Sequence, residues 1–387
     1  MGDAARRRPV IERFEIRVDD AVLDDLHSRL ANTRFPDQID GTGWEYGFPA
    51  DELRDLVAYW RDEYDWRVAE ARLNEFAHYR TTIDGQAIHF IHARSPHTDA
   101  LPLLITHGWP GSVVEFLDVI PRLTEPEAHG GRSADAFHVV APSLPGYGFS
   151  EPTRTRGWDP WRIARAFVEL MDRLGYLRYG AQGGDWGAQV TTRIGAIDAE
   201  HCAAIHLNMP LADRPDEQIP LTDEEQADLA AIAHFRREES GYAQEQGTKP
   251  QTLGVALNDS PAGLLGWIVE KFRTWSDCDG RLENAFTRDQ LITNVMTYWV
   301  TETITSSVRL YRELRHTTSE PGAPEFVGVP TGIARYPKEP LRLPRSWVEQ
   351  RYHVTHWAEM PRGGHFAAME QPELFVDDLR GFFRTVR

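Results

Sequence analysis

The stretch Gln182-Gly183-Gly184-Asp185-Trp186-Gly187 decides how the rest of the chain is interpreted. It follows residues 179–182, which read as a strand, and leads into residues 188–197, which read as a helix. Glycines at positions 183 and 187 flank Asp185 in the pattern G-x-nucleophile-x-G. This spacing is typical of a tight strand-to-helix turn that holds one side chain clear of the backbone. We therefore predict that Asp185 is a nucleophile.

The chemistry depends on finding Asp at a position that Ser usually occupies. A carboxylate attacks a saturated carbon and leaves an ester whose carbonyl belongs to the enzyme. The positive end of the following helix would help to keep Asp185 ionised. The alternative is that this stretch is only a glycine-rich turn with a polar cap, and the remaining motifs argue against it.

Composition limits the classes of function. The 387 residues include 42 Lys and Arg against 59 Asp and Glu, a net charge of −17 that argues against a nucleic-acid surface. Cys202 and Cys278 are the only cysteines, so no disulfide framework is predicted and a reducing cytoplasm is the expected location. The sequence has no secretory signal and no apolar run of membrane-spanning length, so we expect a soluble protein without a membrane partner.

Strands alternate with helices through most of the chain. A hairpin is predicted over residues 78–82 and 87–92, joined at Asp84-Gly85. Buried strands are predicted at residues 103–106, 137–141, 179–182, 202–207, 326–333 and 353–360. A helix with Ile163, Phe167, Leu170 and Leu174 on one face precedes the Asp185 turn. The alternation predicts an α/β fold with a mostly parallel sheet covered by helices on both faces.

Two helical regions interrupt this pattern. Residues 1–75 are predicted to form a helical arm whose many aromatic side chains pack onto a larger core. Residues 76–209 form the first part of the core, and residues 210–322 form a helical lid with helices at 222–237, 261–275 and 287–314. Residues 323–387 complete the core, with a last helix from Phe366. Because ligands bind at the carboxyl ends of such strands, the site should lie beneath the lid.

A nucleophile of this kind needs an acid and a histidine later in the chain, in that order. His365 follows the final predicted strand within a glycine-rich turn, although a lone His is more often a surface or core residue. Glu339 is the carboxylate in the loop after the preceding strand, where the alternative is an exposed loop residue. Trp109 ends an earlier strand, so its N–H and that of Trp186 could converge on the carbonyl oxygen of Asp185. The alternative for Trp109 is a strand-ending turn with a packed indole.

Four motifs in register give the chain a family resemblance. They are H-G-W-P-G-S at 107–112, G-G-D-W-G at 183–187, V-P-T-G at 329–332 and R-G-G-H-F-A-A-M-E-Q-P-E at 362–373. Together with the N-terminal arm, they resemble the epoxide hydrolases of the α/β-hydrolase superfamily, in the microsomal-type branch, over nearly the whole chain. The resemblance implies an α/β-hydrolase fold. The membrane anchor of the mammalian members is not found here, which fits a soluble bacterial type.

The resemblance also implies a mechanism and two further residues. Tyr242 and Tyr311 match the lid tyrosines that hold and polarise the epoxide oxygen, although from sequence alone either could be lid packing. Asp185 would open the ring to form an aspartyl ester, and His365, oriented by Glu339, would activate the water that releases a vicinal diol. No metal or organic cofactor is expected.

Two other functions stay open at this point. A haloalkane dehalogenase would use the same Asp and His but different N–H donors, and a non-catalytic hydrolase-fold receptor would bind a small hydrophobic molecule. Trp267, Trp275 and Trp299 suggest a pocket for an aryl or bulky epoxide, although packing explains them equally well. Similar proteins occur in bacterial natural-product pathways, including those for enediyne antibiotics. The sequence does not decide the oligomeric state, for which a homodimer is one option.

Overall fold

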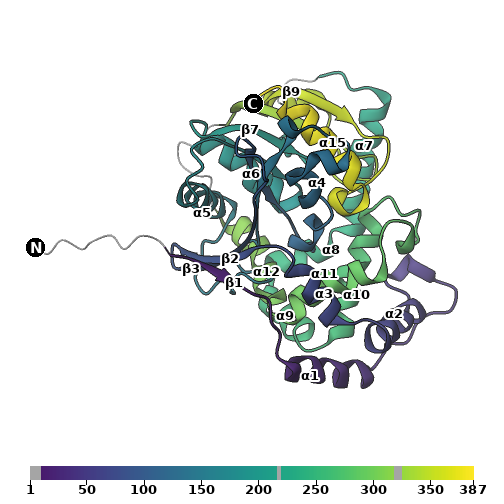
Figure 1. The fold of residues 1–387 in the computed structure, drawn as a ribbon. Coiled ribbons are helices and arrows are strands. Elements are labelled where there is room, and N and C mark those ends of the chain that lie inside the picture. The colour runs from purple at the N-terminus through teal and green to yellow at the C-terminus, as the bar shows by residue number, and fades with distance from the viewer. Residues whose placement is uncertain (1–9, 216–218, 318–324) are drawn as a thin grey trace, which may run out of the picture.

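The computed structural model describes residues 10–215, 219–317 and 325–387. Within these ranges, nine strands form one sheet in the order β1-β2-β3-β5-β4-β6-β7-β8-β9 (Figure 1). The strands are β1 (Ile11–Phe14), β2 (His78–Ile83), β3 (Gln86–Ala93), β4 (Leu101–Thr106), β5 (Phe137–Pro142), β6 (Tyr179–Gly183), β7 (Cys202–Leu207), β8 (Val327–Arg335) and β9 (Tyr352–Glu359). All pairs from β5 across to β9 are parallel, and β1, β2 and β3 extend the sheet in antiparallel pairs. The predicted mostly parallel sheet is confirmed.

Helices fill the connections between these strands. The core helices are α4 (Ile120–Thr124), α5 (Pro160–Arg173), α6 (Asp185–Ile197), α13 (Arg345–Arg351), α14 (Ala367–Glu370) and α15 (Pro372–Phe383). Between β7 and β8 lie α7 (Asp223–His234), α8 (Gly241–Thr248), α9 (Pro250–Leu257), α10 (Pro261–Trp275), α11 (Arg288–Trp299) and α12 (Ile304–His316). The helices before β2 are α1 (Asp20–Ala31), α2 (Ala50–Asp62) and α3 (Trp66–Leu73). Short helical turns occur at Gly43–Tyr46, Val113–Phe116, Pro126–His129, Ser133–Asp135 and Leu282–Asn284, and a π-helical turn occurs at Phe235–Glu239.

Side chains of β7 show that helices cover both faces of the sheet. Ile205 packs against Gly195 of α6. The ring of the next residue, His206, lies 5.8 Å from the ring of Phe382 in α15. Because successive strand residues point to opposite faces, α6 and α15 lie on opposite sides of the sheet. The sheet is therefore enclosed by helices, as expected for parallel strands rich in apolar residues.

The helical insertion after β7 follows the prediction in part. Helix α10 has the predicted bounds, and α7 lies within the predicted helix at 222–237. The single helix predicted over 287–314 is wrong, because the chain breaks between α11 and α12. At the break Glu302 adopts a positive φ of 53°, and the Thr301 hydroxyl donates a 2.5 Å hydrogen bond to the carbonyl of Thr297. Neither Gly nor Pro marks this break, so the sequence gives no local signal for it.

The N-terminal region is not helical throughout, which corrects one expectation. Residues of β1 pair with β2, with Ile11 opposite Thr81, and so the chain enters the sheet before the arm helices begin. The aromatic side chains of the arm pack in part as predicted, since Trp60 and Trp66 are buried whereas Tyr46 is 74% exposed. The Tyr59 hydroxyl donates a 2.8 Å hydrogen bond to Asp289 of α11, which joins the arm to the lid. The division into arm, core and lid domains at the stated boundaries stays a prediction.

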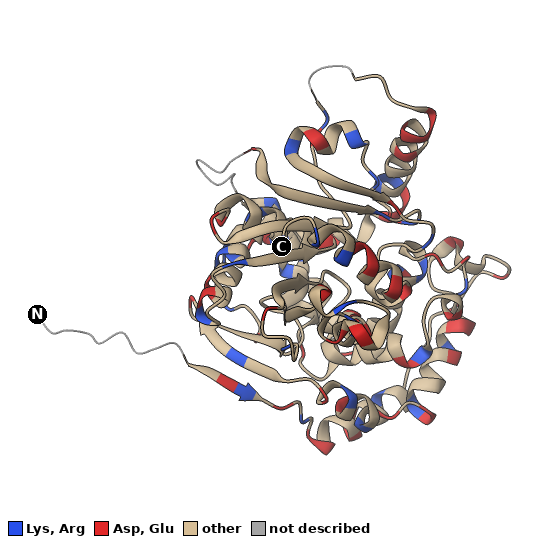
Figure 2. Ribbon diagram, turned by 45° about the horizontal axis from the view of Figure 1, so that its top comes forward, with Lys and Arg blue, Asp and Glu red and all other residues tan. Residues whose placement is uncertain are grey.

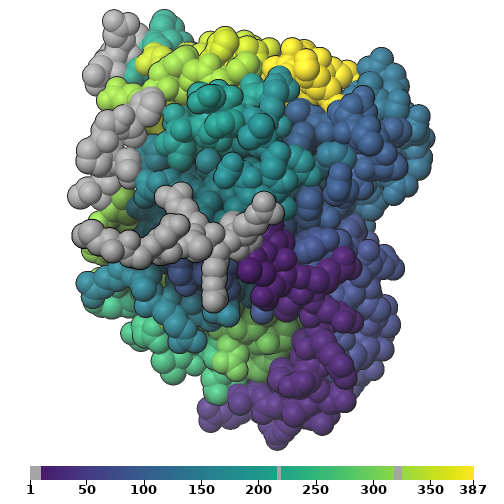
Figure 3. All heavy atoms as spheres, turned by 60° about the vertical axis from the view of Figure 1, so that its left-hand side comes forward, coloured from purple at the N-terminus to yellow at the C-terminus, as the bar shows by residue number. Residues whose placement is uncertain are grey.

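The pictures show how these parts lie together. Helices α9 to α12 and the arm helices α1 to α3 gather below the sheet, whereas α7 lies beside β9 (Figure 1). In the space-filling view, the purple N-terminal segment lies against green lid residues on one face (Figure 3). Acidic positions recur along the arm, the lid and the core helices (Figure 2). No helix in the described ranges combines the length and apolar character needed to cross a bilayer.

Candidate active site

Asp185 lies at a tight turn where β6 ends and α6 begins. Its φ is +50°, a conformation that few residues other than Gly adopt. The turn is tight because Gly187 lies against the strand end of β4, and a Cβ there would be 1.9 Å from the carbonyl oxygen of Thr106. A Cβ at Gly108 would lie 2.2 Å from Oδ1 of Asp185. Both glycines are therefore required for the carboxylate to stand where it does.

Two groups contact the carboxylate of Asp185 from different directions. The Trp109 backbone N–H donates a 2.8 Å hydrogen bond to Oδ1. The Nε2 atom of His365 lies 3.5 Å from Oδ2. Trp109 thus lies where the sequence predicts an oxyanion donor, with its N–H directed at the carboxylate. Trp186 is the next residue in α6, and its role as the second donor stays a prediction.

His365 lies between two carboxylates. Its Nδ1 atom is 2.8 Å from Oε2 of Glu339, and the Leu341 N–H donates a 3.3 Å hydrogen bond to the other oxygen of Glu339. The side chains of His365 and Glu339 are only 6% and 3% exposed. Burial alone would lower the pKa of His365, but Glu339 and Asp185 outweigh it and raise that pKa well above its usual range. The structure therefore brings together the three residues of the predicted triad.

The two lid tyrosines converge above the Asp185 turn. Their ring centroids are 5.8 Å apart, and the Tyr242 ring stacks on Trp109 at 5.3 Å. The Tyr311 ring lies edge-on to Trp186, with 4.7 Å between centroids. Burial raises the pKa of both phenols, and the charge of Asp185 adds to this effect. Both tyrosines are therefore neutral and able to donate a proton.

The three lid tryptophans that suggested an aryl pocket occupy different places. Trp275 is at the site, where its ring lies 5.0 Å from the ring of His365 and its carbonyl accepts a 2.9 Å hydrogen bond from the His365 N–H. Trp267 donates a hydrogen bond to Gln246 within the lid. Trp299 lies beneath the guanidinium of Arg29 from the arm. Trp275 alone among the three contacts a triad residue in these interactions.

A small cavity under the nucleophile contains a residue that sequence reasoning missed. Asp185, His365 and Glu115 line it, and it has room for about one water molecule. Burial raises the pKa of Glu115 to about 8, and the charge of Asp185 contributes to this shift. Glu115 follows the motif at 107–112 and contacts Gly111, where a Cβ would be 1.6 Å from its Oε1. In the sequence, only the closeness of Glu115 to the motif at 107–112 could have indicated that it lies at the site.

A second cluster of histidines and a carboxylate lies outside this site. Asp378 accepts contacts from His206 at 2.8 Å and from His356 at 2.7 Å. Burial would raise the pKa of Asp378, but the two histidines lower it overall. Each ring is thus paired with the carboxylate. Over the described ranges, no group of three or more His, Cys, Asp or Glu side chains is arranged to hold a metal ion.

The chain matches two family models and is similar to several known proteins. A family model described as the epoxide hydrolase N terminus matches residues 11–116, and a model of the alpha/beta hydrolase fold matches residues 102–258. Epoxide hydrolase 1 from Sus scrofa is 39% identical over 407 residues, covering 98% of this chain and 90% of that protein. A Stigmatella aurantiaca protein provisionally named an epoxide hydrolase is 49% identical over 381 residues, covering 97% and 86%. The juvenile hormone epoxide hydrolase structure from Bombyx mori superposes with a TM-score of 0.90 at 34% identity, covering 99% and 96% of the two chains.

Proposed function

The chain belongs to the epoxide hydrolase family of the α/β-hydrolase fold, and from that premise we propose that it converts an epoxide to a vicinal diol through a covalent ester on Asp185. One observation carries the proposal. The carboxylate of Asp185 lies 3.5 Å from Nε2 of His365. The ring of Tyr242 packs on Trp109, whose N–H donates to this carboxylate, and the ring of Tyr311 packs on Trp186, the chain neighbour of Asp185. This arrangement supports the proposal of an oxygen nucleophile, a base and two proton donors that act on one substrate.

The first step is ring opening. A carboxylate oxygen of Asp185 forms a bond to an epoxide carbon as the bond from that carbon to the ring oxygen breaks. Tyr242 and Tyr311 hydrogen-bond the ring oxygen, and one phenol gives its proton to the emerging alkoxide. The elevated pKa of both phenols supports this role, since each keeps its proton until the alkoxide forms.

The second step is hydrolysis of the ester. His365 takes a proton from water, and the hydroxide attacks the carbonyl carbon of the esterified Asp185. The N–H groups of Trp109 and Trp186 stabilise the negative charge on the carbonyl oxygen. Collapse of this intermediate breaks the bond between the carbonyl carbon and the alkoxide oxygen of the diol, and His365 returns its proton to that oxygen. The proton left on the Asp185 carboxyl group restores the phenol, so the diol leaves and the carboxylate is regenerated. Glu339 holds the imidazole in the orientation that this proton transfer needs.

Tyr242 and Tyr311 favour this function over that of a dehalogenase. A halide leaving group carries a full charge and needs no proton, so two phenols with raised pKa values would be of little use to it. A non-catalytic receptor would not need His365 in contact with both carboxylates.

We infer that the substrate is an aryl or otherwise bulky epoxide, because Trp109 and Trp275 face the lid tyrosines. A role in enediyne-like antibiotic biosynthesis, a cytoplasmic location and a homodimer are further proposals.

The proposed function is tested by turnover of racemic styrene oxide with chiral analysis of the diol. A bromoalkane is assayed in parallel. We expect diol from the wild type, none from Asp185→Ala, and wild-type activity from Asp62→Ala, a control that removes an exposed carboxylate of the arm. Bromide release without diol would identify a dehalogenase, and tight binding without either product would identify a receptor.

A further inference from the structure

The loop that carries Glu339 begins and ends next to arginines. We define the acid loop as residues 336–341, which lie between Arg335 at the end of β8 and Arg342. Arg342 also folds back over the loop, because its Nη1 donates a 2.5 Å hydrogen bond to the carbonyl oxygen of Pro337. The position of Glu339 therefore depends on how these two arginines are held.

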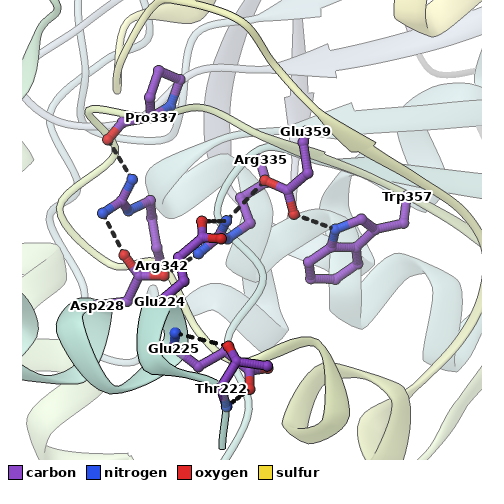
Figure 4. Close-up of polar contacts among 9 residues, drawn as sticks. All are labelled: Thr222, Glu224, Glu225, Asp228, Arg335, Pro337, Arg342, Trp357 and Glu359. Carbon is purple, nitrogen blue, oxygen red and sulfur yellow. Dashed lines mark hydrogen bonds and ion pairs between the residues drawn. The ribbon is translucent and has the colours of Figure 1, made fainter.

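Both arginines contact one carboxylate of the lid. Asp228 of α7 forms an ion pair with Arg335 through one oxygen and with Arg342 through the other (Figure 4). Its side chain is 1% exposed, whereas that of Arg335 is 10% exposed and that of Arg342 is 25% exposed. Ion pairs with so little access to water are screened far less than surface pairs. Asp228 is therefore the buried centre of the cluster.

The remaining contacts of this cluster lie nearer to solvent. Arg335 also contacts Glu224 at 3.1 Å and Glu359 at 2.8 Å, and these two carboxylates are 72% and 58% exposed. Glu359 in turn accepts a 2.7 Å hydrogen bond from the indole N–H of Trp357 (Figure 4). Exposed pairs of this kind contribute little on average. The buried pairs with Asp228 are therefore the ones expected to fix the acid loop.

The same lid also holds the loop of the catalytic histidine. The carbonyl oxygen of Trp275 accepts a hydrogen bond from the His365 N–H, and the carboxylate of Asp277 accepts a 2.9 Å hydrogen bond from the Gly363 N–H. The two loops are joined directly, since the Lys338 N–H donates a 3.1 Å hydrogen bond to the Gly363 carbonyl. Without Asp228, the acid loop would keep this link to the histidine loop and the 2.8 Å hydrogen bond between Glu339 and His365, but it would lose its connection to α7 through both arginines.

Helix α7 connects these contacts to the proton donor. A capping box between Thr222 and Glu225 starts α7 (Figure 4). The chain continues from α7 through the π-helical turn at Phe235–Glu239 into α8. Tyr242 is the second residue of α8. One lid segment thus carries both the carboxylate that contacts the acid loop and the phenol that faces Asp185.

We propose that Asp228 is a positioning residue that ties the lid to the acid loop and keeps Glu339 against His365. This inference rests on the proposed function, because Glu339 is expected to act in the hydrolysis step. Loss of Asp228 frees both arginines, and the acid loop then moves relative to Nδ1 of His365. Ring opening needs the Asp185 carboxylate and the tyrosines, so it should be less affected than ester hydrolysis.

The test is single-turnover kinetics of Asp228→Asn with styrene oxide, following the ester on Asp185 by mass spectrometry of quenched samples. We expect ring opening close to the wild-type rate and hydrolysis slower by roughly tenfold, since a displacement of about 1 Å can cost up to about 10²-fold. Because Glu339 raises the pKa of His365, the rise of the hydrolysis rate with pH should also move to lower pH. A purely structural role would not move that pH profile.

Three further variants control the experiment. Glu224→Gln removes an exposed carboxylate from the same arginine and helix, and should leave both steps unchanged. Asp228→Glu keeps the charge and should recover part of the hydrolysis rate. If Asp228→Asn does not fold, Arg342→Gln carries the same test, because its side chain is more exposed and the pair between Asp228 and Arg335 remains.

Two results would overturn the proposal. Equal loss of ring opening and hydrolysis would show that Asp228 supports the lid in general, and an unchanged pH profile of hydrolysis would show that Glu339 does not depend on it. Neither result resembles failure of the proposed function, in which the wild type itself would form no ester and no diol.

Discussion

Replacing His365 with Gln should separate the two steps of the reaction. Gln can still hydrogen-bond Glu339, which lies 2.8 Å from Nδ1 in the wild type, but it cannot take a proton from water. The Trp109 N–H remains on Asp185, so the nucleophile stays in position. We therefore expect one equivalent of epoxide to be opened and the ester to persist.

The size of the effect follows from the enclosure of the site. A positioned general base contributes about 10²–10⁴-fold, and a side chain that is only 6% exposed leaves little access for a base from bulk water. We expect ester hydrolysis to slow by roughly 10³-fold, which corresponds to about 4 kcal/mol in the barrier. Because Glu339 then lacks its charged partner, the variant should also lose stability, by about 3–5 kcal/mol if the pair behaves as a typical buried one.

The assay is mass spectrometry of the intact protein after mixing with styrene oxide, followed by peptide mapping. The expected product carries the mass of one substrate on the peptide that contains Asp185. His353→Gln, at an exposed histidine of β9, is the matched control and should turn over normally. The reasoning would be refuted if the folded His365→Gln protein formed diol at the wild-type rate, or if it consumed epoxide without any mass appearing on Asp185.

Two other predictions follow from the pKa shifts. Tyr242→Phe and Tyr311→Phe should each slow ring opening, by less than the roughly 10²–10³-fold that is typical for loss of a sole oxyanion donor. The double variant should nearly abolish ring opening. If the double variant stayed active in the single-turnover assay, neither tyrosine would be the proton donor. Glu115 keeps its proton up to about pH 8 in the folded protein, against an ordinary value of 4.5, so the wild type should lose stability as pH rises between these values. Above pH 8, Glu115→Gln should therefore exceed the wild type in free energy of unfolding by roughly 1 kcal/mol or more, given about 1.4 kcal/mol per pKa unit, and it should melt at a higher temperature. Identical pH dependences of the melting temperature in the two proteins would contradict this.

The parts of the site that the sequence predicted are those encoded by short motifs. The glycines around Asp185 are required by contacts within a few residues or with one strand end. The glycine pattern can therefore be recognised in the sequence without knowing the whole fold. His365 and Glu339 could be placed because each follows a predicted strand in a fixed order along the chain. The structure brings both to Asp185 through the parallel order of β6, β7, β8 and β9.

The features that escaped prediction depend on partners far along the chain. Strand β1 has a short, half-polar sequence, and it becomes a strand because β2 offers a free edge to pair with. In the sequence, Asp228 does not differ from the other acidic residues of its helix, because its partners Arg335 and Arg342 are more than 100 positions away. The break at Glu302 likewise carries no Gly or Pro. In each case the deciding contact lies in another element, which periodicity and spacing do not reveal.

The position of His365 between two carboxylates has a consequence for timing. While Asp185 is free, its charge helps to keep a proton on the imidazole. An ester on Asp185 is neutral, so this attraction ends when the nucleophile is consumed. We therefore expect the pKa of His365 to fall, and the imidazole to lose its proton and become free to accept one from water, only once there is an ester to hydrolyse. Consumption of the nucleophile would then act as the trigger for the second half-reaction, with no conformational signal required.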